Sequence, residues 1–189
     1  MALAIAQVAS ATTLVAQDVA ALTKASTVVV RAKVLASQAR WTSDRARIIT
    51  DTELEVLSTW KGAASQRLVV MQPGGIVGEV GQKVEGAARF EPGEEVVVFL
   101  EPRGQRFTVA GMAQGLFHLE RSSDGKAVFA RQELDEALLL DPVTRQPVAA
   151  PTTILSVEQL EAQVRAALGT GTVAPVKPPT STKPPLVTP

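Results

Sequence analysis

The segment from Thr50 to Glu101 reads TDTELEVLSTWKGAASQRLVVMQPGGIVGEVGQKVEGAARFEPGEEVVVFLE. Polar and apolar residues alternate in Ile48–Trp60, and shorter apolar runs follow at Arg67–Gln72 and Val96–Leu100. Alternation with a period of two is typical of half-buried strands, whereas a short apolar run bounded by turn residues indicates a buried strand. Glycines crowd the loop at Pro73–Gly81. This stretch predicts an antiparallel β domain and contains no obvious catalytic group.

Further strands are predicted on both sides of this stretch. Upstream, Thr27–Ala36 alternates with a period of two. Downstream, Gly115–Arg121 and Lys126–Arg131 flank an Asp124-Gly125 pair. Because aspartate and glycine both tolerate the positive φ angles of a tight turn, such a pair between alternating segments indicates a β-hairpin. The strands together favour a mainly β chain.

Two helices are predicted to flank these strands. Asp18–Ser26 has apolar residues close to helical spacing, with Asp18 suited to the positive end of the helix dipole. Ser156–Leu168 is the clearest helix, because Ser156 and Gln159 have the spacing of a capping box and apolar residues follow on one face. Gln132–Leu140 fits either a short helix or a last strand. We expect a small antiparallel β-barrel, OB-like, with an N-terminal and a C-terminal helix, over residues 12–168.

Both ends of the chain have distinctive composition. Residues 1–11 are small and mostly apolar and finish in Ala9-Ser10-Ala11, which matches a signal peptide that lacks its positive start; export would leave a mature chain beginning near Thr12. An ordinary amphipathic helix over Ala2–Ala25 is the alternative. Residues 169–189 carry half of the 12 prolines of the chain, all of them beyond residue 174. This composition predicts a disordered, proline-rich tail.

Composition excludes several classes of function. The chain has 189 residues, with 19 lysines and arginines balanced by 19 aspartates and glutamates. A neutral chain argues against binding to nucleic acid or to an anionic membrane surface, and no apolar run is long enough to span a bilayer. There is no cysteine, which removes disulfides and thiolate chemistry. Scarce lysine with abundant alanine, valine and arginine is typical of GC-rich bacterial genomes.

The glycine loop is the first candidate site. Its Gly74, Gly75, Gly78 and Gly81 superficially resemble a phosphate-binding loop. Such a loop must open a helix whose N-terminal amides meet the phosphate, and no helix start follows here. A hairpin or crossover loop fits better, and loops on rigid scaffolds often form contact surfaces. We therefore expect a contact surface made by the following residues: Gly74, Gly75, Gly78, Gly81, Trp41 and Trp60.

The single histidine, His118, is the second candidate. It alternates with Phe117 and Leu119 in a predicted strand. One histidine without cysteine excludes a zinc site of the histidine–cysteine type, and no nucleophile elbow accompanies it. The carboxylate pairs Glu94-Glu95 and Asp135-Glu136 are explained by a solvated turn and a helix end, since a glycosidase cleft would need more aromatic residues. We expect a surface or rim histidine, and no catalytic, metal or cofactor site.

One family resemblance extends over Thr27–Ala110. The pattern of Val28–Val34 followed by Leu54–Gly62, with the later Gly93–Leu100, resembles the strands of netrin-like modules, the OB-fold group that includes the tissue inhibitors of metalloproteinases. The resemblance implies an OB-fold barrel. Inhibition of a metalloprotease is not implied, because those inhibitors bind the metal through an N-terminal cysteine that this chain lacks.

These observations predict an exported bacterial protein, located in the periplasm, the outer envelope or outside the cell. We expect a non-enzymatic binding or structural module of the cell envelope, whose partner is another envelope protein. Two alternatives stay open. One is an enzyme of unrecognised type that uses carboxylates near His118, and the other is a subunit of an envelope assembly. Clustering of His118 with the acidic pairs in a pocket would favour the enzyme, and an apolar patch beside the glycine loop would favour the binding module.

Overall fold

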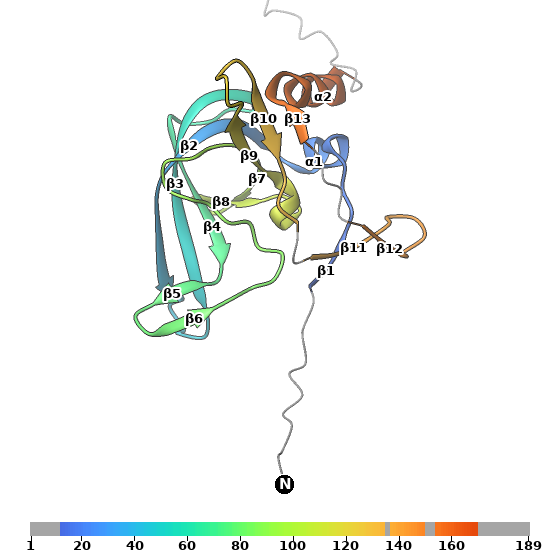
Figure 1. Cartoon of the computed structure of the whole chain (residues 1–189). Helices are drawn as coiled ribbons and strands as arrows, with labels where there is room; N and C mark the ends of the chain where they lie inside the picture. Colours follow the sequence, from blue (N-terminus) through green and yellow to red (C-terminus); the bar gives the residue numbers. More distant parts are fainter. Residues whose placement is uncertain (1–11, 135–136, 150–153, 170–189) are drawn as a thin grey trace, which may run out of the picture.

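A computed structural model describes residues 12–134, 137–149 and 154–169 of the chain. The expected signal peptide at residues 1–11 lies outside these ranges, as do residues 170–189 of the expected tail. The fold is mainly β, with two helices among the described residues (Figure 1). The strands are β1 Thr12–Val15, β2 Val28–Trp41, β3 Ile48–Lys61, β4 Arg67–Pro73, β5 Gly75–Val77, β6 Val80–Gln82, β7 Glu95–Arg103, β8 Arg106–Val109, β9 Leu116–Arg121, β10 Val128–Arg131, β11 Ala137–Leu140, β12 Pro147–Val148 and β13 Ile154–Ser156. The helices are α1 Val19–Ala25, α2 Val157–Gly169 and the short 3₁₀ turn η1 Met112–Gly115.

Five strands of the largest sheet form a ring. Their order is β7-β2-β3-β4-β8, and β8 returns to pair with β7. The strand pairs β7–β2, β2–β3, β3–β4 and β7–β8 are antiparallel. The pair β4–β8 is parallel and joins Val70 to Phe107. The expected all-antiparallel arrangement is therefore wrong at this point, because β8 approaches β4 from the β7 hairpin and runs in the same direction.

The sheet continues beyond the ring through β9, β10 and β13. Strand β7 is shared by both parts: its first half pairs with β9 and its second half with β8. Its side chains alternate between two apolar clusters. Val96, Val98 and Leu100 pack inside the ring, while Val97 and Phe99 pack on the helix side. All five are fully buried, which confirms the expectation that this strand is central.

Helices α1 and α2 lie side by side over the outer face of β7, β9 and β10 (Figure 1). Leu22 of α1 and Leu160 and Val164 of α2 are completely buried there. The caps are those the sequence predicts. The Oδ1 atom of Asp18 accepts the backbone N–H of Ala21 at 2.7 Å. At the start of α2, Ser156 and Gln159 exchange side-chain-to-backbone hydrogen bonds of 2.9 and 3.2 Å.

The predicted hairpin and the ambiguous segment are also placed. β9 and β10 form the hairpin around Asp124-Gly125, with Gly125 at a φ of 71°. The segment at Gln132–Leu140 ends in strand β11, which pairs with β12 and, in parallel, with β1. Strand β1 was not expected from the sequence, and it excludes a continuous helix over the described part of Ala2–Ala25.

Trp60 does not lie where simple alternation places it. Alternation along β3 puts Trp60 on the same face as Leu54, inside the ring. In the pairing of β3 with β2, however, Leu57 and Trp60 have no partner residue on β2, so β3 is irregular at both positions. An extra residue reverses the faces of the side chains that follow it. Trp60 therefore packs on the helix side and is only 8% exposed.

Candidate functional site

The glycine loop folds as a small hairpin of β5 and β6, turning at Gly78 and Glu79. It is fastened to the start of β3 at three points. The Gly74 N–H donates to the Ile48 carbonyl at 2.8 Å, the Thr50 hydroxyl donates to the Gly74 carbonyl at 2.7 Å, and the Ile48 N–H donates to Oε1 of Gln82 at 2.7 Å. The hairpin is thus held against the ring at the end opposite to the helices (Figure 1).

Two of its glycines are required by this attachment. Gly75 has a φ of 137°, and a Cβ atom there would lie 2.5 Å from Oγ1 of Thr50 and 2.8 Å from Cβ of Ala39. Gly74 has a φ of 92°, and a Cβ atom would lie 2.7 Å from the carbonyl oxygen of Gln82. Both the backbone angles and the close contacts therefore exclude a side chain at these positions. The glycines bring the hairpin backbone close to β3.

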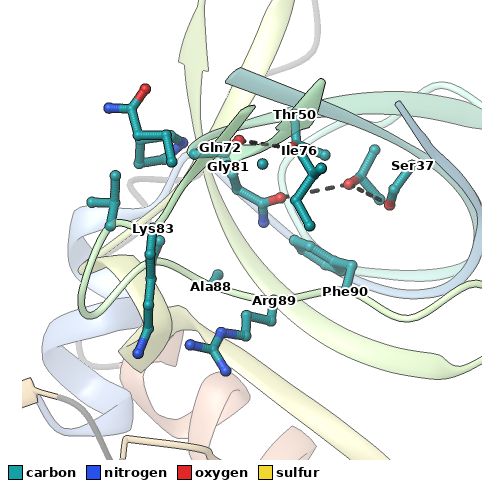
Figure 2. Close-up of a pocket in the computed structure, with 16 residues that line it drawn as sticks. Ser37, Thr50, Gln72, Ile76, Gly81, Lys83, Ala88, Arg89 and Phe90 are labelled. Carbon is teal, nitrogen blue, oxygen red and sulfur yellow. Dashed lines mark hydrogen bonds between the residues drawn. The ribbon is translucent and has the colours of Figure 1, made fainter. Parts of the chain in front are cut away.

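A cavity of about 560 Å³ lies between this hairpin, the ring strands β2, β3 and β4, and the segment that leads from β6 towards β7. Its volume falls within the roughly 300–1,000 Å³ of small-molecule sites. Figure 2 shows Ile76 and Gly81 of the hairpin on one side, with Ala88 and Phe90 across from them. No aspartate or glutamate lines the cavity. The expected contact residues Gly74, Gly75 and Gly81 all contribute to its wall.

Polar side chains from three adjacent strands meet in the wall of the cavity. Ser37 and Thr52 are joined through their hydroxyl oxygens at 2.9 Å, and Oγ1 of Thr52 lies 3.5 Å from Oε1 of Gln72 (Figure 2). Thr52 is fully buried and Gln72 is 6% exposed. The amide nitrogen Nε2 of Gln72 is buried and has no hydrogen-bond partner in the protein. Buried polar groups are nearly always paired, so this one calls for an explanation.

One apolar side chain of the hairpin is exposed at the mouth of the cavity: Ile76 is 74% exposed. Val80 is also exposed, but it lies on the other face of the hairpin, because Ile76 pairs with Gly81 and Val77 with Val80. Lys83 lies on the rim, where its ammonium pairs with Glu85 at 3.2 Å. The apolar patch that would favour a binding module stays a prediction, with Ile76 as its one member next to the cavity among the described residues.

The other expected contact residues are separated from one another. Gly78 lies exposed at the tip of the hairpin, with a φ of 60° and no atom near its missing side chain. Trp41 is exposed at the end of β2 and pairs across the sheet with Ile48. The prediction that Trp60 belongs to the contact surface is wrong, because the irregularities in β3 direct its side chain towards the helix-side core.

His118 occupies a different part of the structure, on β9. Its Nδ1–H group donates to Oε2 of Glu94 at 2.8 Å, and the two side chains are 12% and 19% exposed. The other oxygen of Glu94 accepts the N–H of Glu91, which fixes the carboxylate. The expectation of a surface or rim histidine stays a prediction: His118 is half-buried, and the turn before β7 brings Glu94 within hydrogen-bond distance of its Nδ1.

The surroundings of His118 raise its pKa. Burial alone would lower the pKa, and Arg131 acts in the same direction. The hydrogen bond that His118 donates to Glu94 and the negative charges of Glu94 and Glu133 outweigh both effects. The pKa of His118 therefore lies above its ordinary value, and the imidazolium form is favoured.

The histidine borders a separate cavity of about 80 Å³, together with Arg89, Glu133 and Leu134. A histidine oriented by a carboxylate can act as a general base. Among the described residues, no serine or threonine lines this small cavity. Asp124, which follows in sequence, instead accepts from Ser122 at 2.6 Å within the β9–β10 turn. The second carboxylate pair, Asp135-Glu136, lies outside the described residues.

The described residues offer neither a metal centre nor a membrane-spanning helix. Within these residues, no three histidine, aspartate or glutamate side chains gather as a cluster that could hold a metal ion. Among the same residues, neither α1 nor α2 has the length and apolar character needed to cross a membrane.

Sequence reasoning missed the polar residues of the large cavity, Ser37, Thr52 and Gln72. They come from three strands and are separated by 15 and 20 positions. One signal could have pointed to them: Thr52 and Gln72 interrupt the inward-facing positions of β3 and β4, where Leu54 and Val70 are the neighbouring buried residues. A polar residue at such a position needs a partner.

Comparisons with models of protein families, with curated proteins and with solved structures gave no match to this chain.

Proposed function

We propose that this chain is a non-enzymatic binding module, and that it receives its ligand in the 560 Å³ cavity beneath the β5–β6 hairpin. The observation that carries the proposal is a largely apolar hollow of ligand size, in whose wall the polar side chains of Ser37, Thr52 and Gln72 meet. An apolar pocket with a few convergent polar groups is the usual form of a ligand site. The exposed Ile76 at its mouth supplies apolar contact area for a partner.

The fold proposed for this module is OB-like, as the resemblance to netrin-like modules implies. The five-stranded ring with one parallel pair supports the idea. OB-folds bind their ligands across the second and third strands of the barrel. Counted from β2, those strands are β3 and β4, which supply Thr52 and Gln72 to the cavity.

The module is proposed to be exported by a bacterium and to act in the cell envelope, where its partner is another envelope protein. The support is the composition of the chain and the Ala9-Ser10-Ala11 sequence. N-terminal sequencing of the native protein tests export. A native protein that begins at Met1 and stays in the cytoplasm would contradict it.

Crosslinking in the native cell tests the binding site. A photoreactive amino acid placed at Ile76 should give a discrete product, whereas the same residue at Val143, which is 86% exposed in the β11–β12 connection, should give none. A second change, Gly81→Phe, should narrow the cavity and abolish the product. Gly81 has room for a side chain, since a Cβ atom would meet only Ile76, at 3.8 Å.

The matched control for that change is Gly169→Phe at the end of α2, where a Cβ atom would meet nothing within 4 Å. It should leave the crosslinked product unchanged. Equal crosslinking at positions 76 and 143, or a product that survives Gly81→Phe in a folded protein, would contradict the proposed binding site.

A second candidate function is favoured by the contact of Glu94 with His118. In this reading, the pair activates water for a hydrolytic reaction. The 80 Å³ cavity beside His118 is small compared with ligand sites, which weighs against it. An ester substrate such as p-nitrophenyl acetate, assayed with the wild type, His118→Gln and Glu94→Gln, separates the two functions. The enzyme requires a loss of roughly 10²- to 10⁴-fold in both variants, whereas the binding module requires no turnover that depends on His118.

A further inference from the structure

We infer that the partner docks as an extended segment, which adds a strand to the open edge of β6 and places an apolar side chain over the 560 Å³ cavity. In this mode of recognition, backbone hydrogen bonds supply the affinity and a pocket beside the strand selects the side chain. This inference rests on the binding function proposed above and specifies how the partner is held.

The hairpin of β5 and β6 has one strand edge without a neighbour. The two strands form a sheet of their own, so β6 is paired on one side only. Strand β5 instead lies against β2 and β3, and Gly74 just before it is hydrogen-bonded to β3. A strand edge presents unpaired N–H and C=O groups and readily accepts a further strand.

The register of the hairpin determines which backbone groups point outward. Val77 pairs with Val80 across a two-residue turn, so these two residues exchange both backbone hydrogen bonds. Hydrogen-bonded and non-hydrogen-bonded pairs alternate along an antiparallel ladder, so the next pair, Ile76 with Gly81, is of the second kind. The N–H and C=O of Gly81 therefore point away from β5. Neither group is bonded to another residue of the described part of the chain.

Gly81 also leaves room for a side chain of the partner. It is exposed, and a Cβ atom there would meet only Ile76, at 3.8 Å. Residues directly opposite each other on paired strands point to the same face of a sheet. A partner residue opposite Gly81 would therefore direct its side chain to the face of Ile76, which borders the cavity.

The lining of the cavity selects an apolar side chain for this position. Val84, Ala88 and Phe90 line the cavity together with Ile76, and no aspartate or glutamate among the described residues does so. A lysine or arginine of the partner would lose its hydration there without gaining a carboxylate. An aliphatic or aromatic side chain fits the lining instead.

The edge of β6 lacks the usual protection against strand addition. Native edge strands are guarded by charged residues, prolines or bulges. None of Val80, Gly81 and Gln82 is charged or a proline, whereas the edge strand β12 contains Pro147. An unguarded edge next to a hollow is the arrangement that strand addition requires.

Two substitutions at Gly81 test strand addition, with the photoreactive amino acid at position 76 as the probe. Gly81→Pro removes the outward N–H, which the pairing of β5 with β6 does not use, and strand edges tolerate proline. The matched variant Gly81→Ala keeps the N–H and adds a methyl group that has room. In native cells, the crosslinked product should be about two- to tenfold weaker in Gly81→Pro than in Gly81→Ala, which is the worth of one hydrogen bond.

Hydrogen exchange of the purified protein tests the edge without a partner. The Gly81 amide should exchange faster than the Val80 amide, whose hydrogen bond to Val77 closes the hairpin. A Gly81 amide that is protected as well as Val80 would show that the edge is already covered, and the inference would be wrong. The same measurement on Gly81→Pro shows whether Val80 stays protected and the hairpin stays folded.

The partner segment gives a second test, which holds even if Gly81→Pro unfolds the hairpin. Mass spectrometry of the wild-type product should attach position 76 to a segment in which apolar residues alternate with a period of two. A segment with helical spacing of its apolar residues, or a charged residue at the attached position, overturns strand addition.

The outcomes separate this inference from the function on which it rests. Equal product in Gly81→Ala and in a folded Gly81→Pro overturns strand addition but leaves the binding site in place. Loss of the product in both variants also overturns strand addition, because the space at Gly81 then matters rather than its N–H. Absence of the specific product in the wild type overturns the proposed function itself.

Discussion

The two ends of the five-stranded ring are packed differently. At the helix end, Phe99, Phe117 and Leu160 are completely buried, and the helices cover the outer face of the sheet. At the hairpin end, the ring is closed by a glycine-rich backbone that contributes few side chains, and a hollow remains. The first end is close-packed, as protein interiors normally are. The second is not, although the same strands run through both.

The helix end accounts for the stability of the fold, whereas the hairpin end has the features proposed for binding. Apolar burial at the helix end stabilises the fold, although Oε1 of Gln17, just before α1, is also buried without a hydrogen-bond partner among the described residues. At the hairpin end, Gln72 keeps an unpaired donor and Ile76 exposes an apolar side chain, and each lowers the stability of the isolated protein or adds nothing to it. Side chains that do not add to the stability of a fold are expected at the place where the protein binds a ligand or partner.

The largest effect is expected in the interior of the ring. Val98→Asp places a carboxylate among the apolar side chains of the ring interior, where Val98 is fully buried. Burial of an unpaired charge should lower the free energy of unfolding by several kcal/mol. Urea denaturation measures the loss. The control Val143→Asp at an exposed position should change stability by about 0.5 kcal/mol or less.

The helix end should also respond strongly to loss of packing. Leu160→Ala removes a completely buried side chain of α2 and should cost about 2–5 kcal/mol. The same change at Leu57, an exposed residue of β3, should cost at most about 1 kcal/mol. Equal losses in the two variants would show that α2 does not pack on the sheet as described.

Local chemistry could be predicted from the sequence because it acts over a few residues. The Asp18 cap, the capping box of Ser156 with Gln159, and the hairpin at Asp124-Gly125 each depend on neighbours within about five positions. The central strand was predictable for a similar reason, since five consecutive apolar residues at Val96–Leu100 can only be buried on both faces.

Long-range geometry could not be predicted in the same way. The face of Trp60 depends on two irregularities in β3 that the alternation of residues does not reveal. The contact of Glu94 with His118 joins residues 24 positions apart, across the β7–β9 pairing. The cavity likewise depends on where the hairpin meets β3. The sequence analysis identified its glycines as a contact surface, but the polar residues opposite them belong to other strands and were missed.

The His118–Glu94 pair predicts a pH dependence smaller than either core effect. The pKa of His118 is raised in the folded state, because the hydrogen bond and charge of Glu94 outweigh burial. A raised pKa stabilises the fold most at pH values below the unfolded pKa of about 6.5, and this contribution is lost as pH rises through the folded pKa. The free energy of unfolding should therefore fall as the pH rises from about 6.5 through the folded pKa.

The matched variant His118→Gln keeps a hydrogen-bonding side chain but does not titrate in this range. Its stability should be nearly independent of pH over the same interval, when measured by urea denaturation. A wild type whose stability rises with pH would contradict the assignment of the raised pKa to the pair, because that slope requires a lowered one.

The smallest change in stability, and the most informative one, is expected from Gln72→Met. Most substitutions at buried positions destabilise a protein. This one removes an unpaired polar nitrogen and replaces the glutamine by an apolar side chain of similar length. We expect the free energy of unfolding to stay within about 0.5 kcal/mol of the wild type or to rise. The contrast is Thr52→Val, which removes a fully buried hydroxyl that is hydrogen-bonded to Ser37 and should cost about 1 kcal/mol. Urea denaturation of both variants measures the difference. If Gln72→Met costs 2 kcal/mol or more, the glutamine supports the fold, and the hairpin end is as much a part of the stable core as the helix end.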